Sequence, residues 1–338
     1  MWLPIRRVSS SFLRHNIHCD NAMPNILPAA LLKKTISIII PTYNGAHKLP
    51  YLLEALSEQT LKPDQILVVV DGSSDWTASV LQSFQQRMPV LGSIFIENSG
   101  RSIVRNTGAR QATGDILLFF DDDMVPEADC VQKHCQHHMQ EDASFLTGMA
   151  IDCFTETDIQ RYKNALALKW ARQISGNGKI LLGKENLYLT AAHFSTHRST
   201  FEQLGGFDEK LRDAEDGDLA HRAHKKGFRL FFDHSLMANH RDRIKGISYI
   251  RRLREYRQAH IMLYASKPQI YKDVKKSYQY RPGFLKRLVY RFFATERWIR
   301  WLDHDNGKWL LPRSIRYRIY SLIITSNTEV FPSRVILP

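Results

Sequence analysis

An apolar run that stops at three aspartates sets the strongest limit on what this chain can fold into. Residues 116–120 are all apolar, and Asp121, Asp122 and Asp123 follow them directly. A short run without polar alternation is typical of a strand that is covered on both faces of its sheet. Open α/β sheets bind their ligands at the carboxyl ends of such strands. Because adjacent carboxylates repel one another and are costly to bury, this cluster favours a hard divalent cation, Mg²⁺ or Mn²⁺, that also holds phosphate oxygens.

Three earlier apolar runs repeat the pattern and indicate the fold class. The expected strands are 37–40, 66–70 and 93–96, and the expected helices are 50–59, a segment with Val80, Leu81, Phe84 and Met88 on one face, and 101–112. Buried strands that alternate with helices predict an α/β fold, with a mostly parallel central sheet and helices on both of its faces.

After Pro126 the alternation becomes irregular. The expected elements are a helix, then strands at 145–149, 187–189 and 228–232, with a long variable stretch at 152–186. The acidic segment Glu215–Asp218 opens a further helix, which Gly227 ends. From Lys245 onward the pattern predicts only helices.

Positive charge is concentrated late in the chain. Residues 241–320 hold 21 Lys and Arg against 6 Asp and Glu, a balance of +15, whereas the whole chain carries +13. A basic segment beside a nearly neutral body favours an anionic partner, either lipid head groups or nucleic acid. No apolar run approaches the roughly 20 residues that a membrane-spanning helix needs. We expect residues 1–34 to form a flexible leader, or Met23 to be the true start.

Four cysteines in 338 residues do not make a disulfide framework and indicate a reducing compartment. One segment gathers thiols and imidazoles: Cys130, His134, Cys135, His137 and His138. Its spacing matches no common zinc site, and the sequence offers no second half-site. We therefore expect a helix that carries its histidines on exposed faces.

Four segments, taken together, point to one family. They read SIIIPTYNG, VVVDGSSD, ENSGRSIVRNTGARQATGDILLFFDDDM and RSTFEQLGGFDEKLRDAEDGDLAHRAHKKGFRL. In this order and spacing they closely resemble the GT-A fold glycosyltransferases of family 2, which are inverting enzymes, over about residues 35–242. The resemblance implies a Rossmann-like GT-A catalytic domain at 35–244, divided into a nucleotide-binding half at 35–123 and an acceptor-binding half at 124–244. Residues 245–338 form a basic helical extension.

The first two segments supply the expected nucleobase site. Pro41, Tyr43 and Asn44 cap the first strand, and the resemblance implies that a base stacks on the flat ring of Tyr43. A partly buried core tyrosine is the alternative. Asp71 ends the second strand, and the resemblance implies that its carboxylate accepts the imide N–H of uracil. Members of the family often have two aspartates here, but this chain has Val70 before Asp71. A turn with a helix cap is the alternative role of this segment.

The third segment supplies the expected diphosphate and metal site. Arg105 and Asn106 match an Arg-Asn pair near the nucleotide, and a guanidinium suits a diphosphate because its charge is permanent. Asp121 and Asp123 match the DxD motif. The resemblance implies that Asp123 ligates the metal, that Asp121 lies near the ribose or the metal, and that Asp122 fills the variable middle position beside the nucleotide. His240 corresponds to a histidine that completes the metal or diphosphate site in some relatives.

The last segment supplies the expected base. Glu215 and Asp216 match the ED motif, whose second residue acts as general base. A positioned carboxylate is needed because sugar hydroxyls are very weak acids. Taken alone, this acidic segment would only be a helix N-terminus favoured by the helix dipole. Arg222 follows at a family arginine position, where it packs or contacts phosphate.

The basic extension contains an amphipathic pattern. Its apolar residues at helical spacing are Phe284, Leu285, Leu288, Val289, Phe292, Phe293 and Ile299, and the basic residues between and after them are Lys286, Arg287, Arg291, Arg297 and Arg300. This pattern favours a helix in a membrane interface, or equally a helix packed on the catalytic domain. The QxxRW pattern of processive synthases is absent, which favours addition of one sugar to a glycan or lipid-linked acceptor.

The complete expectation is a transferase that uses a UDP-sugar, located in the cytoplasm or peripherally at the cytoplasmic face of a membrane, with no nucleic-acid partner. Sugar nucleotidyltransfer is the alternative enzyme class, but it usually needs a glycine-rich basic loop, which PTYNG does not provide. A non-catalytic basic module that binds membrane or nucleic acid is the third reading. The intact Asp71, Asp121, Asp123 and Asp216 speak against it.

Overall fold

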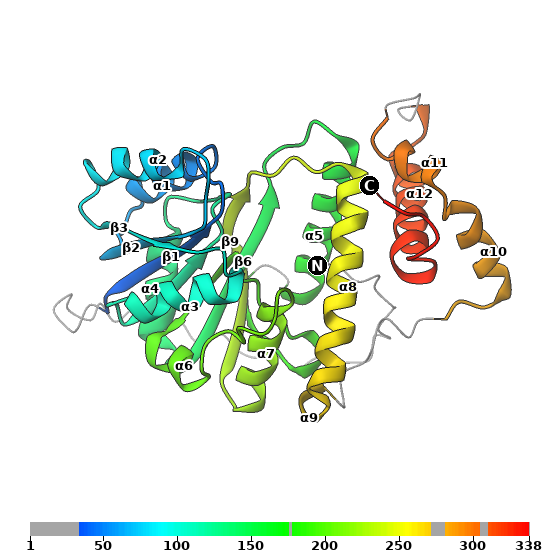
Figure 1. Cartoon of the computed structure of the whole chain (residues 1–338). Helices are drawn as coiled ribbons and strands as arrows, with labels where there is room; N and C mark the ends of the chain where they lie inside the picture. The colour runs from blue at the N-terminus through cyan, green and yellow to red at the C-terminus, as the bar shows by residue number, and fades with distance from the viewer. Residues whose placement is uncertain (1–33, 176–177, 272–280, 305–309, 338) are drawn as a thin grey trace, which may run out of the picture.

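One mixed sheet forms the body of the molecule. The computed structural model describes residues 34–175, 178–271, 281–304 and 310–337 (Figure 1). The leader predicted at 1–34 lies outside these ranges except for Lys34. The strands, in chain order, are β1 (Ile36–Thr42), β2 (Gln65–Asp71), β3 (Leu91–Ile96), β4 (Ile116–Phe120), β5 (Met124–Pro126), β6 (Ser144–Asp152), β7 (Lys179–Leu181), β8 (His193–His197) and β9 (Arg229–His240).

The strand order places the aspartates at an edge of the sheet. The order is β3-β2-β1-β4-β8-β6-β9-β5, with β7 paired to β9. Strands β3, β2, β1 and β4 are parallel, whereas β8 runs antiparallel to β4 and β6. The carboxyl ends of β1, β2 and β4 therefore meet at one edge, where Asp121 begins the loop after β4.

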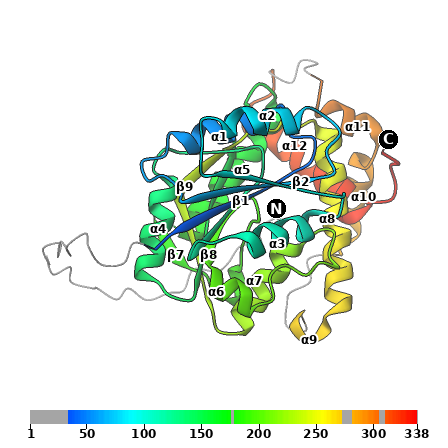
Figure 2. The ribbon, with the colours of Figure 1, turned by 60° about the vertical axis from the view of Figure 1, so that its left-hand side comes forward.

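Helices cover both faces of the sheet (Figure 2). One face carries α1 (Leu49–Ser57), α2 (Thr77–Gln85) and α4 (Cys130–Gln140); the other carries α3 (Arg101–Gln111), α5 (Asp158–Ser175), α6 (Arg198–Gln203) and α7 (Glu215–Lys225). Side chains of β1 alternate between the two faces of the sheet and so belong to two apolar cores. Ile38 and Ile40 pack with α1, while Ile39 packs with α3. This arrangement confirms the predicted fold class.

Gly108 lets α3 approach the sheet closely. A Cβ at this position would lie 2.5 Å from Cγ2 of Ile39 and 3.1 Å from Cγ2 of Val69. Contacts this short do not occur between real side chains, so a larger residue would push α3 away from β1 and β2. Since α3 carries Arg105, this glycine helps to set the depth of a predicted site residue.

Two predicted segments are wrong. Residues 187–189 form no strand; β8 begins instead at His193, and its sequence HFSTH is too polar to be recognised as a buried strand. The stretch 152–186 contains the 18-residue helix α5. Its buried residues Ile159, Tyr162 and Ala167 recur at helical spacing, so the signal was present in the sequence.

The expected surface position of the α4 histidines is also wrong. His134 and His138 have no exposed surface, and His137 is 3% exposed. Their rings face polar groups of neighbouring strands: His134 and His138 both contact Oγ of Ser195, and His137 contacts Oγ of Ser144. Burial of imidazole is tolerated here because hydrogen-bond partners are also buried.

Helices α8 to α12 form the C-terminal part of the molecule, in which α10 packs on α12 and the turn that follows it. They are α8 (Gly246–Ser266), α9 (Pro268–Tyr271), α10 (Phe284–Phe293), α11 (Glu296–Trp301) and α12 (Arg313–Thr325), followed by a helical turn at Ser326–Val330. In Figure 1 α8 stands beside α5, with α10, α11 and α12 beyond it. None of the described helices is long and apolar enough to cross a bilayer.

A third apolar core joins these helices to α5. Ile159 and Tyr162 of α5 pack with Ile250 of α8, Ile299 of α11 and Tyr320 of α12. Asp158, at the start of α5, accepts hydrogen bonds from the Arg316 guanidinium and the Tyr320 hydroxyl, each at 2.9 Å. The C-terminal helices thus share a core with the catalytic body.

Candidate active site

A cavity of about 1340 Å³ opens at the edge where β1, β2 and β4 end. Ligand pockets usually measure about 300–1,000 Å³, so this volume can hold a nucleotide sugar together with part of an acceptor. The residues predicted from the sequence that line it are Pro41, Tyr43, Asp71, Arg105, Asp121, Asp122, Asp123, Asp216 and His240. Its opposite wall comes from α5, α7 and α8.

Asp122 is held by the turn after β1. Its Oδ2 accepts a hydrogen bond from Oγ1 of Thr42 at 2.7 Å, and its Oδ1 lies 3.3 Å from Nζ of Lys48. Burial raises the pKa of Asp122 to about 6, although Lys48 and Thr42 oppose the shift. Gly45 is required beside them, because a Cβ there would lie 2.0 Å from Oγ1 of Thr42. The middle aspartate therefore fastens the acidic loop to the PTYNG turn.

Asp123 turns toward His240. Its Oδ1 lies 3.5 Å from Nε2 of His240, whose Nδ1 lies 2.9 Å from Oδ1 of Asp152. Burial would raise the pKa of Asp123, but His240 and Lys48 lower it to about 2, so this carboxylate is ionised. Burial would lower the pKa of His240, but Asp123 and Asp152 raise it to about 10.

This pair fits a divalent cation. Oδ1 of Asp123 is buried and has no hydrogen-bond partner among the described residues. Its nearest donor, Nε2 of His240, is 3.5 Å away, which is too long for a good hydrogen bond. A cation bound by both residues would take the place of the Nε2 proton of His240 and neutralise the buried carboxylate. Carboxylate oxygens suit Mg²⁺ and Mn²⁺, and imidazole is also accepted by first-row metals. Asp123 and His240 are therefore the residues that would hold the ion, with Asp121 beside them.

Arg105 connects the acidic loop to α7. Its Nη2 donates to Oδ1 of Asp121 at 2.6 Å, and its Nη1 donates to Oε1 of Glu215 at 2.8 Å. The arginine is only 2% exposed. Burial alone would lower the pKa of Arg105, but the two carboxylates more than offset this and raise it. The permanent positive charge of Arg105 thus links the acidic edge to the helix that carries the predicted base.

Asp216 lies in the first turn of α7 and faces the cavity. The chain enters this turn through Ala214, which has a φ of 62°. This left-handed conformation is uncommon for a residue with a side chain. Burial raises the pKa of Asp216, while a hydrogen bond from the Gly217 N–H opposes the shift. A carboxylate with a raised pKa in a cavity has the properties of a general base.

The nucleobase end contains Tyr43 and Asp71. Tyr43 lines the cavity with 54% of its surface exposed, so one face of its ring is open. The carboxylate of Asp71 accepts hydrogen bonds from the backbone N–H groups of Ser99 at 2.6 Å and Gly100 at 3.1 Å. Asp71 therefore orders the loop before α3, and its side chain also borders the cavity.

Four predicted residues do not line the cavity. Asn44 hydrogen-bonds Ser73 and Ser74 within the first two turns. The Asn106 amide binds the backbone of Phe207 and the carboxylate of Glu209. Arg222 binds Asp218 and the carbonyl oxygens of Leu204 and Gly206. Of the two roles expected for Arg222, packing and phosphate contact, the structure shows packing. Glu215 affects the site indirectly, because its ion pair with Arg105 links α7 to the acidic loop.

Several cavity residues are absent from the sequence prediction. Lys48 lies 3.6 Å from Oδ2 of Asp123 as well as near Asp122, and its position just after PTYNG was an available signal. Lys163, whose Nζ lies 2.8 Å from Oδ1 of Asp152, lines the cavity and comes from the stretch that was expected to be variable. Residues of α8 form much of the wall opposite the acidic edge, and no motif marked them: Tyr249, Arg252, Leu253, Tyr256, Arg257, His260 and Tyr264.

Replacing Arg105 by methionine is expected to destabilise the fold. The change leaves Glu215 buried without its cation, and breaking a buried pair typically costs about 3–5 kcal/mol. Chemical denaturation should show this loss of unfolding free energy. The exposed Arg110→Met on the same helix is the matched control and should change stability by less than about 0.5 kcal/mol. Equal stability of both variants would show that the bridge does not hold the two elements.

Comparison with known sequences shows the family. The family described as glycosyl transferase family 2 matches residues 37–205, half of the chain. Glycosyltransferase AglE of Haloferax volcanii is 29% identical over 219 residues, which make up 61% of this chain and 66% of that protein. The uncharacterized glycosyltransferase YfnE of Bacillus subtilis is 38% identical over 114 residues, 33% of this chain and 29% of that protein. The chain thus spans less than two thirds of either relative.

Solved structures share the architecture. The mannosyltransferase PcManGT of Pyrobaculum calidifontis, in complex with GDP-Man and Mn²⁺, has a TM-score of 0.60 at 18% identity, covering 91% of this chain and 90% of that chain. TarS 1-349 of S. aureus in complex with UDP-GlcNAc has a TM-score of 0.51 at 16% identity, covering 88% and 91%. These likenesses confirm the predicted GT-A fold. With half of its length matched by the family, the chain belongs to glycosyltransferase family 2.

Proposed function

We propose that this protein is a metal-dependent, inverting glycosyltransferase that moves one sugar from a UDP-sugar to a hydroxyl of a glycan or lipid-linked acceptor. The observation that carries the proposal is the bridge from Asp121 through Arg105 to Glu215. It holds the acidic edge and Asp216 on one cavity, so a donor diphosphate and an acceptor hydroxyl can meet there.

The proposed reaction is a single displacement. The acceptor oxygen forms a bond to the anomeric carbon while the bond from that carbon to the diphosphate oxygen breaks. Asp216 takes the proton of the acceptor hydroxyl, and the nucleoside diphosphate leaves with the bonding electron pair. Attack on the side opposite the leaving group inverts the anomeric centre. Arg105 stays paired with its two carboxylates and keeps Asp216 at a fixed depth.

Asp123 and His240 would hold the cation, with Asp121 nearby. When bound, Mg²⁺ or Mn²⁺ stabilises the negative charge that develops on the diphosphate. Lys48, which lies between Asp122 and Asp123, adds a fixed positive charge at the same edge.

The choice of a uridine donor rests on Asp71 and Tyr43. The named neighbours differ in donor, since PcManGT was crystallised with GDP-Man and TarS with UDP-GlcNAc. We expect UDP with Mn²⁺ to raise the melting temperature more than either ligand alone, because selective binding to the folded state stabilises it. Matched measurements with GDP and ADP serve as controls. Stabilisation by GDP equal to that by UDP would overturn the uridine assignment while leaving the transferase proposal intact.

A donor-hydrolysis screen separates transfer from the alternative enzyme class. A glycosyltransferase releases the nucleoside diphosphate slowly from its own donor even without acceptor. A sugar nucleotidyltransferase instead releases pyrophosphate when given a sugar phosphate and a nucleoside triphosphate. Detection of UDP from one UDP-sugar, without pyrophosphate formation, is the expected result.

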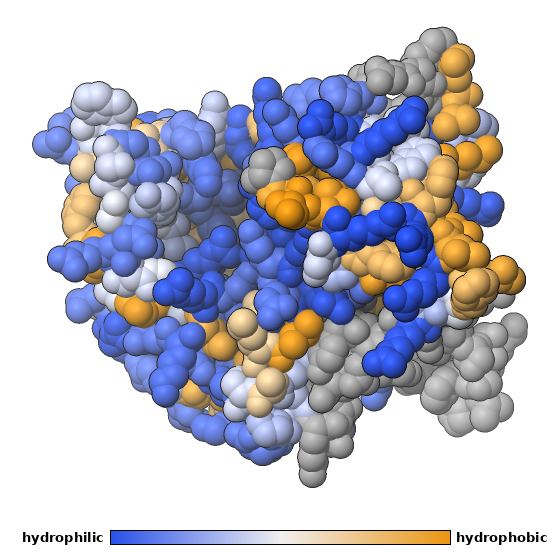
Figure 3. Space-filling view, turned by 45° about the vertical axis from the view of Figure 1, so that its right-hand side comes forward, coloured by the Kyte–Doolittle hydropathy of each residue, from blue (hydrophilic) through white to orange (hydrophobic). Residues whose placement is uncertain are grey.

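We also propose that α10 places the enzyme peripherally on an anionic membrane at its cytoplasmic face. The apolar face of α10 is open to solvent: Phe284, Leu285 and Phe292 are 76%, 77% and 63% exposed. Figure 3 shows hydrophobic surface gathered toward its right-hand edge, over the C-terminal helices. The neighbouring Lys286 and Arg287 are also exposed. Apolar and basic groups on one short helix match the two attractions that hold interfacial helices on anionic lipid.

The membrane proposal predicts a loss of lipid binding after two substitutions. Leu285→Glu with Leu288→Glu should reduce flotation with phosphatidylserine-rich vesicles severalfold, because both apolar contact and charge attraction fall. Val90→Glu with Met139→Glu, at exposed positions on the catalytic body, is the matched control and should float like the unaltered protein. Substitution is preferable to deletion, since removing α8–α12 would uncover the third core. Equal flotation of both double variants would contradict the proposal.

A further inference from the structure

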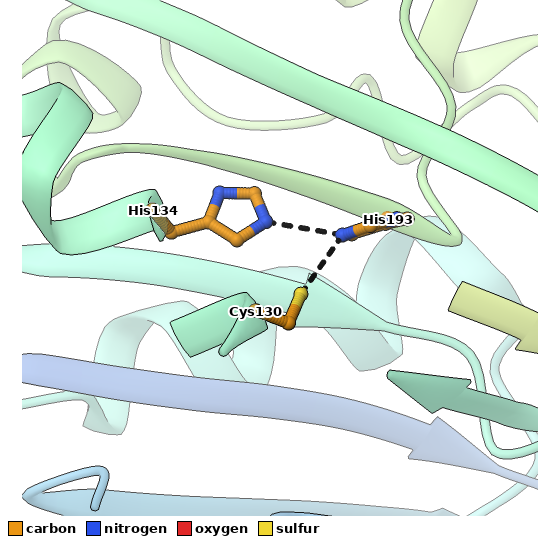
Figure 4. Close-up of side chains that lie close together, drawn as sticks. All are labelled: Cys130, His134 and His193. Atoms are coloured by element: carbon orange, nitrogen blue, oxygen red, sulfur yellow. Dashed lines mark hydrogen bonds between the residues drawn. The ribbon is translucent and has the colours of Figure 1, made fainter. Parts of the chain in front are cut away.

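A thiol and two imidazoles meet in the core between α4 and β8, outside the active-site cavity. Cys130 and His134 stand one turn apart on the same face of α4, and His193 is the first residue of β8. All three have no exposed surface. Figure 4 shows their side chains turned toward one another from the helix and the strand. The second half-site that the sequence did not reveal lies about 60 residues further along the chain.

The distances suit a metal ion. Nε2 of His193 lies 3.1 Å from Nε2 of His134 and 3.4 Å from Sγ of Cys130, and all three atoms lie within 4.8 Å of one another. A point equidistant from atoms with these separations is at most about 2.4 Å from each, close to zinc–sulfur and zinc–nitrogen bond lengths of about 2.3 and 2.0–2.1 Å. Only small shifts would be needed to reach those values.

Separate two-centre hydrogen bonds cannot join Nε2 of His193 to both of its neighbours at once. In any tautomer Nε2 of His193 carries either one hydrogen or one lone pair. It can therefore donate to, or accept from, only one of its two neighbours, although both His134 and Cys130 face it. A metal ion would accept a lone pair from all three atoms. One of the contacts to Nε2 of His193 therefore lacks a hydrogen bond, whereas a single cation could bind all three atoms.

Surrounding residues hold the rings in the orientation that a metal needs. Nδ1 of His134 lies 2.6 Å from Oγ of Ser195, which leaves its Nε2 for the cluster. Metal-bound histidines usually make such a hydrogen bond with their other nitrogen. Gly148 on β6 makes room for the third ring, since a Cβ there would lie 2.3 Å from Cε1 of His193.

We infer that Cys130, His134 and His193 form a structural zinc site that fixes α4 to β8. The fourth ligand would be a small exogenous molecule such as water, since no other His, Cys, Asp or Glu of the described chain belongs to the cluster. Binding converts the Cys130 thiol to a thiolate and releases one proton. Thiolate and imidazole select zinc, whereas the carboxylates of the donor site select harder cations.

A zinc ion at this site would also help to position the neighbouring acidic loop. His193 pairs with Phe120, the last residue of β4, and their rings lie 5.0 Å apart. The Asp121 N–H, one residue on, donates to the carbonyl oxygen of Ala192 at 3.3 Å. A zinc ion on His193 would therefore hold the strand ends from which the predicted donor-site aspartates begin.

Metal analysis of the full-length, untagged protein tests the inference. After gel filtration to remove loosely bound ions, elemental analysis should find about one zinc per chain, since structural zinc binds with apparent free energies of about 10–16 kcal/mol. Cys130→Ser and His193→Asn should each lower this content at least about fivefold. Cys153→Ser removes a thiol outside the cluster, and Asp123→Asn alters the donor site; both should keep their zinc.

A second measurement does not depend on whether the variants fold. The unaltered protein, refolded with Co²⁺ in place of zinc, should show a thiolate-to-cobalt charge-transfer band in the near ultraviolet. The same band in Cys19→Ser, Cys135→Ser and Cys153→Ser, each of which removes a thiol outside the cluster, would assign the thiolate to Cys130. Unaltered protein that holds neither zinc nor such a band after metal supplementation would overturn the site. Zinc lost in Asp123→Asn but kept in Cys130→Ser would overturn it as well, by placing the ion at the donor site.

Discussion

Asp216→Asn should abolish most sugar transfer while donor binding survives. Positioned general bases contribute about 10²–10⁴-fold to rate, and an amide cannot take the acceptor proton. Turnover should fall by a factor in that range, whereas the thermal shift with UDP and Mn²⁺ should stay unchanged because Asp216 lies across the cavity from the acidic edge. Initial-rate assays with saturating donor measure the effect.

The control for this experiment is Asp129→Asn, which makes the same chemical change at a partly exposed position before α4. It should transfer sugar at the normal rate. If Asp216→Asn were equally active, another group of the cavity would have to be the base, and the proposed mechanism would fail at its central step.

Asp123→Asn should remove the metal dependence of donor binding. The substitution keeps the size of the side chain but takes away the negative charge of Asp123, whose Oδ1 makes no hydrogen bond among the described residues. Calorimetric titration of UDP should then give the same weak affinity with Mn²⁺ and with EDTA, whereas the unaltered protein should bind at least about tenfold more tightly with the metal.

Asp122→Asn is the matched comparison. Asp122 is engaged by Thr42 and Lys48, so it should keep most of the metal response and lose mainly stability. A normal metal effect in Asp123→Asn would show that the cation is held elsewhere, and the ligand assignment would then have to be abandoned.

The sheet and its acidic edge could be predicted because they depend on local patterns. Strand β4 begins and ends where its apolar run does, at Ile116 and Phe120. Parallel strands bring their carboxyl ends to one edge, and both Asp71 and Asp121 line the cavity there. The order of motifs along the chain was sufficient for this part of the site.

The direction of each side chain could not be predicted in the same way. Arg105 and Asn106 are neighbours on α3, but successive residues of a helix point about 100° apart. Arg105 therefore faces the cavity, while Asn106 binds the loop at Phe207. The same limit applies to Arg222, which the motif marks and the fold uses to join α7 to the preceding loop.

Contacts between distant segments were missed for a different reason. His193 contacts Cys130 and His134 only because β8 pairs with β4. The local sequence contains no pattern that predicts this pairing. The cavity wall on α8 depends likewise on how the C-terminal helices dock. Sequence patterns specify elements, whereas the chemistry between elements depends on their packing.

The third core has a practical consequence for engineering. Tyr162, Tyr249 and Leu253 belong both to that core and to the wall of the cavity. The C-terminal segment cannot be exchanged as a module with that of a relative, because a new segment would have to match α5 as well as bring its own acceptor contacts. Transplanting acceptor preference into this scaffold will require redesign of α5 and α8 as one unit.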